Sequence, residues 1–392
     1  MGPFEAIFVP DELAEAVSDR AWLEAMLEVE RALANAESLA GVIPADAAGA
    51  IAAACDPGRF DVHELAVQGR SSGNPAEPLV RALRDAVDPA WRDAVHRGAT
   101  SQDVVDTAAV LVARRALGQV IDETDRLAAA AAELARLHRD TPMAARTLLQ
   151  QAVPTTFGLK AAGWLVAVLD ARRGLLRAND GLAAQLGGAA GTLAALGAKG
   201  GEVAELFAAQ LDLPLAPLPW HANRVRMAEL GSALAVVAGV AAKIGTDVAL
   251  LQQTEVGEVL DPGAGGSSTM PHKQNPVASA VAVACARRTA AHASVLLGSL
   301  VGEHERAAGS WHAEWAALSG ALALAGGGLA AVARLLEQLE ADPGRMRANM
   351  RDELYAERDR LGLQADEDYL GQAASFVDRA LAVYAGETEE DW

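Results

Sequence analysis

The chain has 392 residues, of which 51% are hydrophobic and only 4% are aromatic, and its formal net charge is −19. A chain of this length can bury a large core, and it usually forms two or three domains. The strong negative charge argues against a general binder of nucleic acid or anionic membranes, although basic residues in a cleft can still attract an anionic substrate.

The composition indicates an all-helical protein. Long runs consist of Ala, Leu, Val, Glu and Arg, and alanine is the best helix former, whereas strands favour β-branched and aromatic residues. The only cysteines, Cys55 and Cys285, form no C-x-x-C motif, which fits a reducing compartment without disulfides or thiolate metal sites. The acidic N-terminus lacks the apolar core of a signal peptide. We therefore expect a cytoplasmic protein.

In chain order, residues 1–20 have the character of an irregular lead-in, and Asp19 is a candidate cap for a helix over about residues 21–40. Shorter helices follow, interrupted by a polar loop over residues 71–78. A bundle helix is predicted over residues 104–139 because its apolar positions recur at spacings of seven and three. These positions are Val110, Leu117, Val120, Leu127, Leu134 and Leu137.

Further helices are predicted over residues 160–177, 226–256, 277–300 and 318–340. The apolar run 230–251 contains Lys243 and Asp247, which favours a buried bundle helix over a membrane span. The Gly-rich stretch 186–199 lacks a phosphate-binding pattern, so we interpret it as a close-packed loop and expect it to line the pocket. Residues 213–220 contain three prolines and are expected to be an extended connector.

Residues 96–103, HRGATSQD, form the first motif. Thr100 or Ser101 can cap the helix that follows, and the free amides and dipole of that helix would attract an anion. Spacing alone favours an ordinary helix cap over a binding site.

Residues 261–276, DPGAGGSSTMPHKQNP, form the third motif and carry the most chemistry. Three glycines allow its backbone to approach a ligand closely, and two prolines stiffen its second half. Ser267, Ser268, Lys273 and Asn275 supply two hydroxyls, a cation and an amide, which can hold a carboxylate and move a proton beside it. By composition alone, a polar linker between two helices is equally possible.

Residues 146–158, RTLLQQAVPTTFG, form the second motif. In chain order, the three motifs resemble the three signature regions of the fumarase/aspartase superfamily. That superfamily includes class II fumarase and adenylosuccinate lyase. The third pattern, G-S-S-x-M-P-x-K-x-N-P, has few free positions, so chance explains it poorly. Taken alone, the second motif could also be a polar helix start. The resemblance implies three helical domains, over residues 1–103, 104–336 and 337–392, with a central bundle of long helices. It also implies a homotetramer whose active sites collect the three motifs from different subunits, without a metal or an organic cofactor.

The resemblance also implies roles for individual residues. Ser267 matches the catalytic acid/base, and Lys273 acts beside it. The residues expected to bind substrate are His96, Thr100, Ser101, Gln150, Thr155, Arg224, Ser268 and Asn275.

Leu148 departs from the lyase pattern, in which a histidine at this position protonates the leaving group. Leucine cannot transfer a proton, so either another group supplies it or the leaving group needs none. The second motif, the stretch PWHxxR that includes Arg224, and YLGQAASFVDRAL near the C-terminus resemble the bacterial 3-carboxy-cis,cis-muconate cycloisomerase branch. That branch lactonises a small tricarboxylate in the protocatechuate branch of the β-ketoadipate pathway. In reverse its leaving group is a carboxylate, which needs no acid.

Two alternatives stay open. A C–N lyase of the same superfamily would eliminate fumarate from an adenylosuccinate-like substrate, but Leu148 counts against it, as does the lack of a T-x-H-D-like stretch near residues 71–78. A non-catalytic helical paralogue is the other, and the intact third motif counts against it. His304, Glu305 and His312 fit neither H-x-x-x-H nor H-E-x-x-H, so we expect no metal site.

Overall fold

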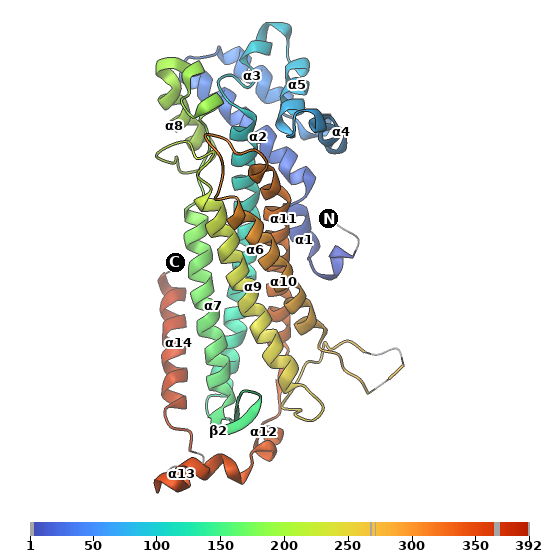
Figure 1. The fold of residues 1–392 in the computed structure, drawn as a ribbon, viewed down its shortest axis with the longest axis vertical. Helices are drawn as coiled ribbons and strands as arrows, with labels where there is room; N and C mark the ends of the chain where they lie inside the picture. Colours follow the sequence, from blue (N-terminus) through green and yellow to red (C-terminus); the bar gives the residue numbers. More distant parts are fainter. Residues whose placement is uncertain (1–3, 267–268, 271, 364–368, 391–392) are drawn as a thin grey trace.

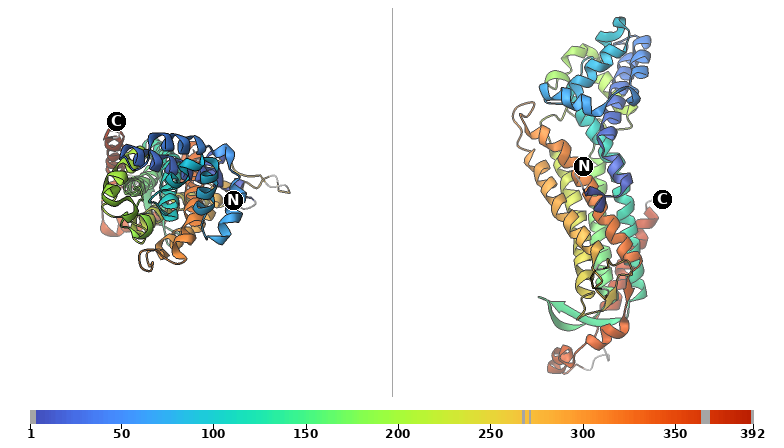
Figure 2. Two further views of the ribbon diagram at one scale, coloured as in Figure 1. Left: turned by 90° about the horizontal axis from the view of Figure 1, so that it is seen from above. Right: turned by 90° about the vertical axis from the view of Figure 1, so that its right-hand side faces the viewer.

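The structure, a computed structural model, describes residues 4–266, 269–270, 272–363 and 369–390. It is elongated, with long helices along its length and short helices gathered at both ends (Figures 1 and 2). The helices of the central bundle are α6 (Ser101–Leu137), α7 (Phe157–Asp180), α9 (Val225–Leu251), α10 (Val277–Gly298) and α11 (Ser310–Glu337). The all-helical expectation is confirmed.

The predicted apolar stripe of α6 forms part of the bundle core. Val110, Leu117, Val120 and Leu127 are fully buried, and Leu134 is buried as well. Leu137, the last residue of the helix, is instead 64% exposed. The spacing rule therefore holds along the helix and fails only where the helix ends.

The N-terminal cluster surrounds the start of α6. It contains α2 (Asp19–Leu39), α3 (Ala45–Ala54), α4 (Val62–Gln68) and α5 (Ala76–Ala86). Helix α1 (Asp11–Ala16) instead packs beside the middle of the bundle, against α6 and α11. Helix α2 begins at Asp19, and its cap is Ser18, whose hydroxyl accepts a hydrogen bond from the amide of Ala21 at 3.1 Å. The expectation that Asp19 caps this helix was therefore wrong by one residue. Helix α8 (Gly200–Gln210) also packs against α2, beyond the ends of α7 and α9 that it connects (Figure 1).

A β-hairpin follows α6 where no strand was predicted. Strand β1 (Pro142–Thr147) pairs antiparallel with β2 (Gln150–Thr156), and Thr147 lies opposite Gln150. Leu148 and Leu149 form the turn, with φ of 50° and 65°. Strand β3 (Val259–Leu260), immediately before the third motif, pairs antiparallel with β4 (Glu340–Ala341), which follows α11. The second motif thus forms most of this hairpin and ends at the start of α7, whose cap is Thr156, with its hydroxyl accepting from the amide of Leu159 at 3.0 Å.

The C-terminal part contains α12 (Pro343–Asn349) and α13 (Ala356–Leu361) at the hairpin end of the molecule, followed by α14 (Ala373–Glu390). Helix α14 returns along the bundle and packs against α7 (Figure 1). Arg139 binds the carboxylate of Asp378 with two hydrogen bonds of 2.7 and 2.6 Å, and Arg173 pairs with Glu387. The last helix is therefore attached to the central bundle.

Within the described residues, α9, α10 and α11 are long and apolar enough to cross a membrane, by length and composition only. The most apolar window of α11 is 78% buried inside the protein, whereas those of α9 and α10 are only 44% and 28% buried. Apolar side chains that remain exposed on α9 and α10 include Val225, Val236, Leu250, Val277, Val295 and Leu297. We call this set the α9/α10 apolar face. Apolar side chains that stay exposed on a single chain in this number are candidates for contacts with another protein surface.

Candidate active site

The first motif forms the N-terminus of α6. Thr100 caps the helix in a capping box: its side chain accepts from the backbone amide of Asp103, and the Asp103 carboxylate accepts from the amide of Thr100 at 2.9 Å. The cap predicted from the sequence is present. Thr100 and Ser101 are half-buried, so both side chains remain accessible at a helix end that favours anions.

Asp103 also fixes the Gly-rich loop against this helix end. Its carboxylate accepts hydrogen bonds from the amides of Gly187 and Gly188, both at 2.9 Å, and contacts His221 Nε2 at 2.7 Å. Gly188 has φ of 69°, and a Cβ there would lie 2.7 Å from the carbonyl oxygen of Gly98. Glycine is therefore required for the loop to approach the first motif so closely.

Arg306 adds a positive charge beside the first motif. Its guanidinium donates to Thr100 Oγ1 at 3.1 Å, to Gln102 Oε1 at 3.1 Å and to the carbonyl oxygen of Ala189 at 3.2 Å. The side chain comes from the segment between α10 and α11 and is only half-buried. Sequence reasoning missed this residue because it stands in an ordinary charged run, EHER.

Arg224 does not take the place expected for a substrate-binding residue. Its side chain is buried, donates to Asp106 Oδ2 at 2.8 Å and to Glu314 Oε1 at 2.9 Å, and is held between these two carboxylates. Burial raises the pKa of Glu314, and Arg224 opposes that rise. The N–H groups of the Arg224 guanidinium are thus already bound to carboxylates inside the protein. We therefore withdraw Arg224 from the substrate-binding set and assign it to an internal ion-pair network.

The second motif presents its polar residues on the hairpin. Gln150 is exposed beside the turn, and Thr155 is half-buried on β2. Leu148 at the turn is 97% exposed. Arg146, on β1, forms two hydrogen bonds of 2.8 and 2.7 Å with the buried carboxylate of Glu258. This pair ties the hairpin to the segment that leads into the third motif.

The third motif is a loop whose two ends are joined by backbone hydrogen bonds. Gly265 and Asn275 exchange backbone hydrogen bonds of 3.0 and 2.8 Å, and a Cβ at Gly265 would lie 2.5 Å from a methyl group of Val277. Lys273 is exposed and Asn275 is half-buried. Ser267 and Ser268 lie outside the described residues.

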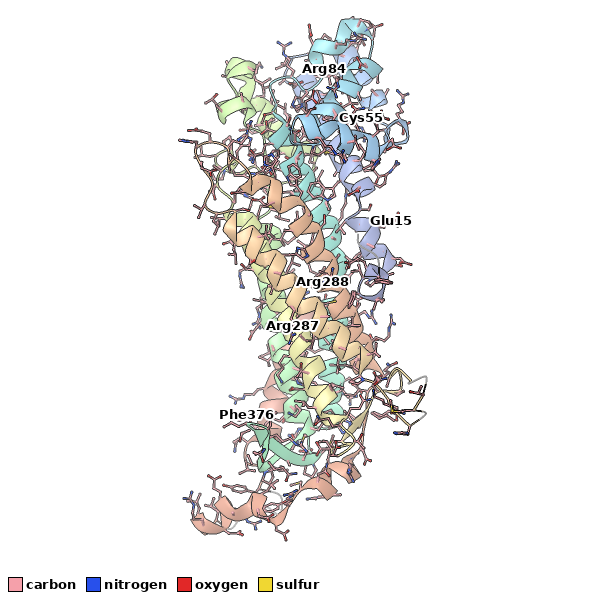
Figure 3. All side chains as sticks on the ribbon, turned by 45° about the vertical axis from the view of Figure 1, so that its right-hand side comes forward. Glu15, Cys55, Arg84, Arg287, Arg288 and Phe376 are labelled. Carbon is pink, nitrogen blue, oxygen red and sulfur yellow. The ribbon has the colours of Figure 1, made fainter. Side chains whose placement is uncertain are left out.

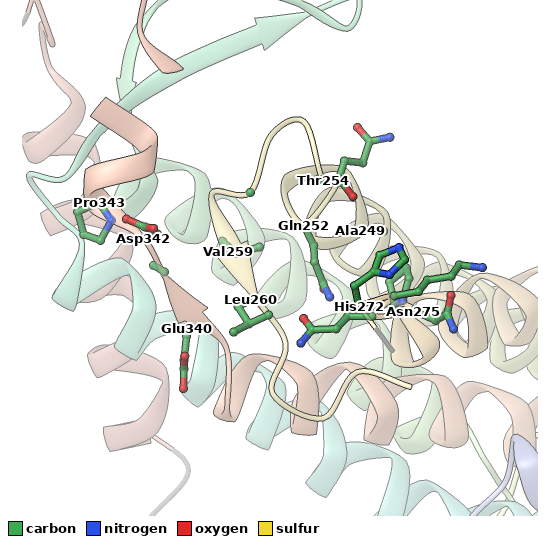
Figure 4. A pocket seen from close by; sticks show the side chains of 16 residues that line it. Ala249, Gln252, Thr254, Val259, Leu260, His272, Asn275, Glu340, Asp342 and Pro343 are labelled. Atoms are coloured by element: carbon green, nitrogen blue, oxygen red, sulfur yellow. The ribbon is translucent and has the colours of Figure 1, made fainter. Parts of the chain in front are cut away.

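A pocket of about 770 Å³ lies behind the third motif (Figure 4). Lys273, Asn275 and His272 line one side of it, and Gln252 and Thr254 line another. Among the described residues, neither polar atom of the buried Gln252 amide has a hydrogen-bond partner. The pocket therefore offers the cation of Lys273 beside amide side chains, which suits a carboxylate ligand.

The three motifs do not meet within one chain. Helix α6 has 37 residues, so its two ends are about 55 Å apart at 1.5 Å per residue. The first motif lies at one end, while the hairpin follows the other end and is bound to the base of the third motif. The chain thus brings the second and third motifs to one end and leaves His96, Thr100 and Ser101 at the opposite end.

Comparison with known proteins gives strong matches. A family model described as lyase matches residues 8–290. The chain is 50% identical over 342 residues to 3-carboxy-cis,cis-muconate cycloisomerase of Bradyrhizobium diazoefficiens, covering 86% of this chain and 76% of that protein. It is 47% identical over 349 residues to nitrosuccinate lyase of Streptomyces davaonensis, covering 86% and 74%. The crystal structure of 3-carboxy-cis,cis-muconate lactonizing enzyme from Pseudomonas putida superposes with a TM-score of 0.90 at 38% identity, covering 98% of this chain and 99% of that one.

Proposed function

This chain belongs to the lyase family of the fumarase/aspartase superfamily, and we propose that it is a cycloisomerase that lactonises 3-carboxy-cis,cis-muconate. The likeness to 3-carboxy-cis,cis-muconate cycloisomerases, at 50% identity to the Bradyrhizobium diazoefficiens enzyme, carries the proposal, and the residue at the hairpin tip is consistent with it. Leu148, where lyases of this superfamily place an acid, has no proton to give, and its side chain is 97% exposed. A reaction whose leaving group is a carboxylate tolerates this residue, because that group departs as a stable anion.

The chemistry assigns a task to each motif. One substrate carboxylate adds to a carbon–carbon double bond and forms the C–O bond of the lactone, while the α-carbon beside another carboxylate receives a proton. Ser267 delivers that proton. Lys273, Asn275 and Ser268 stabilise the enolate-like charge that develops on the neighbouring carboxylate. Transition-state charge next to a fixed cation is the largest single contribution that such a site offers.

The first motif holds a second carboxylate of the substrate. Thr100 and Ser101 offer hydroxyls at the positive end of α6, and Arg306 supplies the cation that Arg224 does not. Gln150 and Thr155 position the remaining carboxylate from the hairpin. Each of the three carboxylates of the substrate is thus bound by a different motif.

We also propose a homotetramer with shared active sites, which the superfamily resemblance implies and which two features of the single chain support. The motifs lie about 55 Å apart along α6, which far exceeds the length of a small tricarboxylate, and the α9/α10 apolar face is left uncovered on a single chain. Antiparallel packing of chains through that face would bring the first motif of one copy to the hairpin and third motif of others. We further propose a cytoplasmic location and the division into three helical domains over residues 1–103, 104–336 and 337–392.

Elimination of nitrite from nitrosuccinate is a second candidate activity. The relative from Streptomyces davaonensis supports it at 47% identity. Nitrite, like a carboxylate, leaves as a stable anion, so Leu148 fits this reaction equally well. An adenylosuccinate-like substrate fits less well, because an amine must be protonated as it leaves.

An ultraviolet assay separates these activities. With 3-carboxy-cis,cis-muconate and no added metal, the diene absorbance should fall as the lactone forms, and Ser267→Ala should abolish the change. Nitrosuccinate and adenylosuccinate are run in parallel, with fumarate release as the readout. If the diene absorbance stays constant and nitrosuccinate yields fumarate, the protein is a nitrosuccinate lyase and not a cycloisomerase. If adenylosuccinate yields fumarate, both of these assignments are wrong. If none of the three compounds is converted, the result would favour a non-catalytic helical paralogue.

A further inference from the structure

A buried carboxylate lies directly behind the first motif. Glu30, on α2, places Oε1 2.6 Å from His96 Nδ1. The Glu30 side chain is fully enclosed, whereas 12% of the His96 side chain is exposed. The imidazole is therefore the member of this pair that a substrate can reach.

His96 is held in an unusual backbone conformation. Its φ of 60° lies in the left-handed region, which side chains other than glycine rarely adopt. Such strain persists at functional sites only where surrounding contacts impose it. The short contact with Glu30 is the contact that fixes His96, four residues before the capping residue Thr100.

We propose that Glu30 is a positioning residue, which ion-pairs with the imidazolium of His96 and directs its second nitrogen toward a carboxylate of the substrate at the first motif. This inference rests on the proposed function, because it needs an anionic substrate there. With Nδ1 occupied by Glu30, Nε2 is the donor that remains. Glu30 itself touches no substrate.

The charges around His96 support a cationic imidazole. Burial lowers the pKa of His96, but the charge and hydrogen bond of Glu30 raise it, Asp103 on α6 raises it further, and the net pKa lies above the usual value. Arg84 on α5, in the same N-terminal cluster (Figure 3), acts in the opposite direction. Asp103 already binds Thr100, Gly187, Gly188 and His221. Glu30 is therefore the carboxylate that contacts the ring.

Glu37 provides a matched control on the same helix. It is as buried as Glu30, and neither of its oxygens has a hydrogen-bond partner among the described residues. Burial and then the charge of Glu30 raise its pKa to about 8. Of these two carboxyl groups, only Glu30 contacts His96, so Glu37 reports what a buried carboxyl group on α2 does without that contact.

The test measures the pKa of His96 by hydrogen–deuterium exchange at its ring carbon, read by mass spectrometry on the full-length protein. Glu30→Gln should lower that pKa by about one unit or more, and Glu37→Gln should leave it within about 0.3 units. An unchanged value in Glu30→Gln would overturn the inference. Because this readout needs no substrate, it decides the pairing even if the proposed reaction fails.

Kinetics then test the use of the pair. Near pH 7.5, Glu30→Gln should raise KM about tenfold while kcat stays within about threefold, and KM should recover as the pH falls below the lowered pKa of His96. His96→Gln should raise KM at every pH and remove the pH dependence, and Glu37→Gln should behave as the parent. A normal KM in His96→Gln would refute the proposal even if Glu30→Gln failed to fold.

Discussion

Glu37 should make this protein less stable at alkaline pH. It is buried on α2, and burial, then the charge of Glu30, raise its pKa to about 8 against the opposing charge of Arg97. In the unfolded chain the same carboxyl group titrates near 4.5. Below that pH both states carry the proton and stability is unaffected. As the pH rises toward 8 the unfolded chain releases a proton that the folded protein keeps, so stability falls, and above 8 the loss is complete.

Titration of Glu37 between these two pKa values corresponds to a loss of at most about 5 kcal/mol in the free energy of unfolding. Relaxation of the protein and entry of water should reduce this loss to about 2–4 kcal/mol. Glu37→Gln removes the titrating group at nearly constant volume. Urea unfolding at one protein concentration should show the variant gaining at least about 2 kcal/mol over the parent between pH 5 and pH 9. Glu24→Gln, exposed on the same helix, should run parallel to the parent. A constant difference between Glu37→Gln and the parent across this range would refute the reasoning.

Three other changes test the site and the assembly. Ser267→Ala should lower kcat on 3-carboxy-cis,cis-muconate by about 100-fold or more because it removes the proton shuttle; turnover within tenfold of the parent in the diene assay would reject that role. Val236→Asp introduces a charge on the α9/α10 apolar face and should reduce the assembly size in sedimentation, whereas Leu39→Asp, on α2, should not. Arg224→Met leaves two carboxylates buried without their partner and should lower stability by about 3–5 kcal/mol, measured by thermal unfolding; an unchanged Tm would contradict the network.

The helices were predictable because alanine-rich composition and apolar spacing act over many residues. The α6 stripe and its Thr100 cap follow from spacing and from one side chain at a helix start. The hairpin was not predictable. Its turn contains Leu148 and Leu149, whereas tight hairpin turns are recognised by Asn-Gly or Asp-Gly. Pro154, which looked compatible with a helix start, lies instead within a two-stranded pair, where an edge position tolerates it.

The sequence predicted the motifs of the candidate site but not which side chains contact one another in the folded protein. Sequence order locates the first and third motifs, but it does not tell which arginine has carboxylates beside it. Asp106 lies on α6 and Glu314 on α11, and only the packing of α11 against both α6 and the start of α9 encloses Arg224 between them. Arg306 reaches the first motif because the segment after α10 folds back over the helix end. Long-range contacts of this kind leave no local signal.

The hairpin tip connects the fold to the proposed chemistry. Leu148 and Leu149 are 97% and 77% exposed and adopt positive φ, a conformation that costs an ordinary side chain about 1 kcal/mol or more. Neither feature benefits a single chain in water, since exposed leucines gain no burial and Asn or Gly would relieve the backbone. Both are explained if the tip is inserted against another copy, where two leucines exclude water from a reacting carboxylate. A residue that sealed a site in this way would not need to donate a proton, so a leucine would be sufficient at the position where an amine-expelling lyase requires an acid.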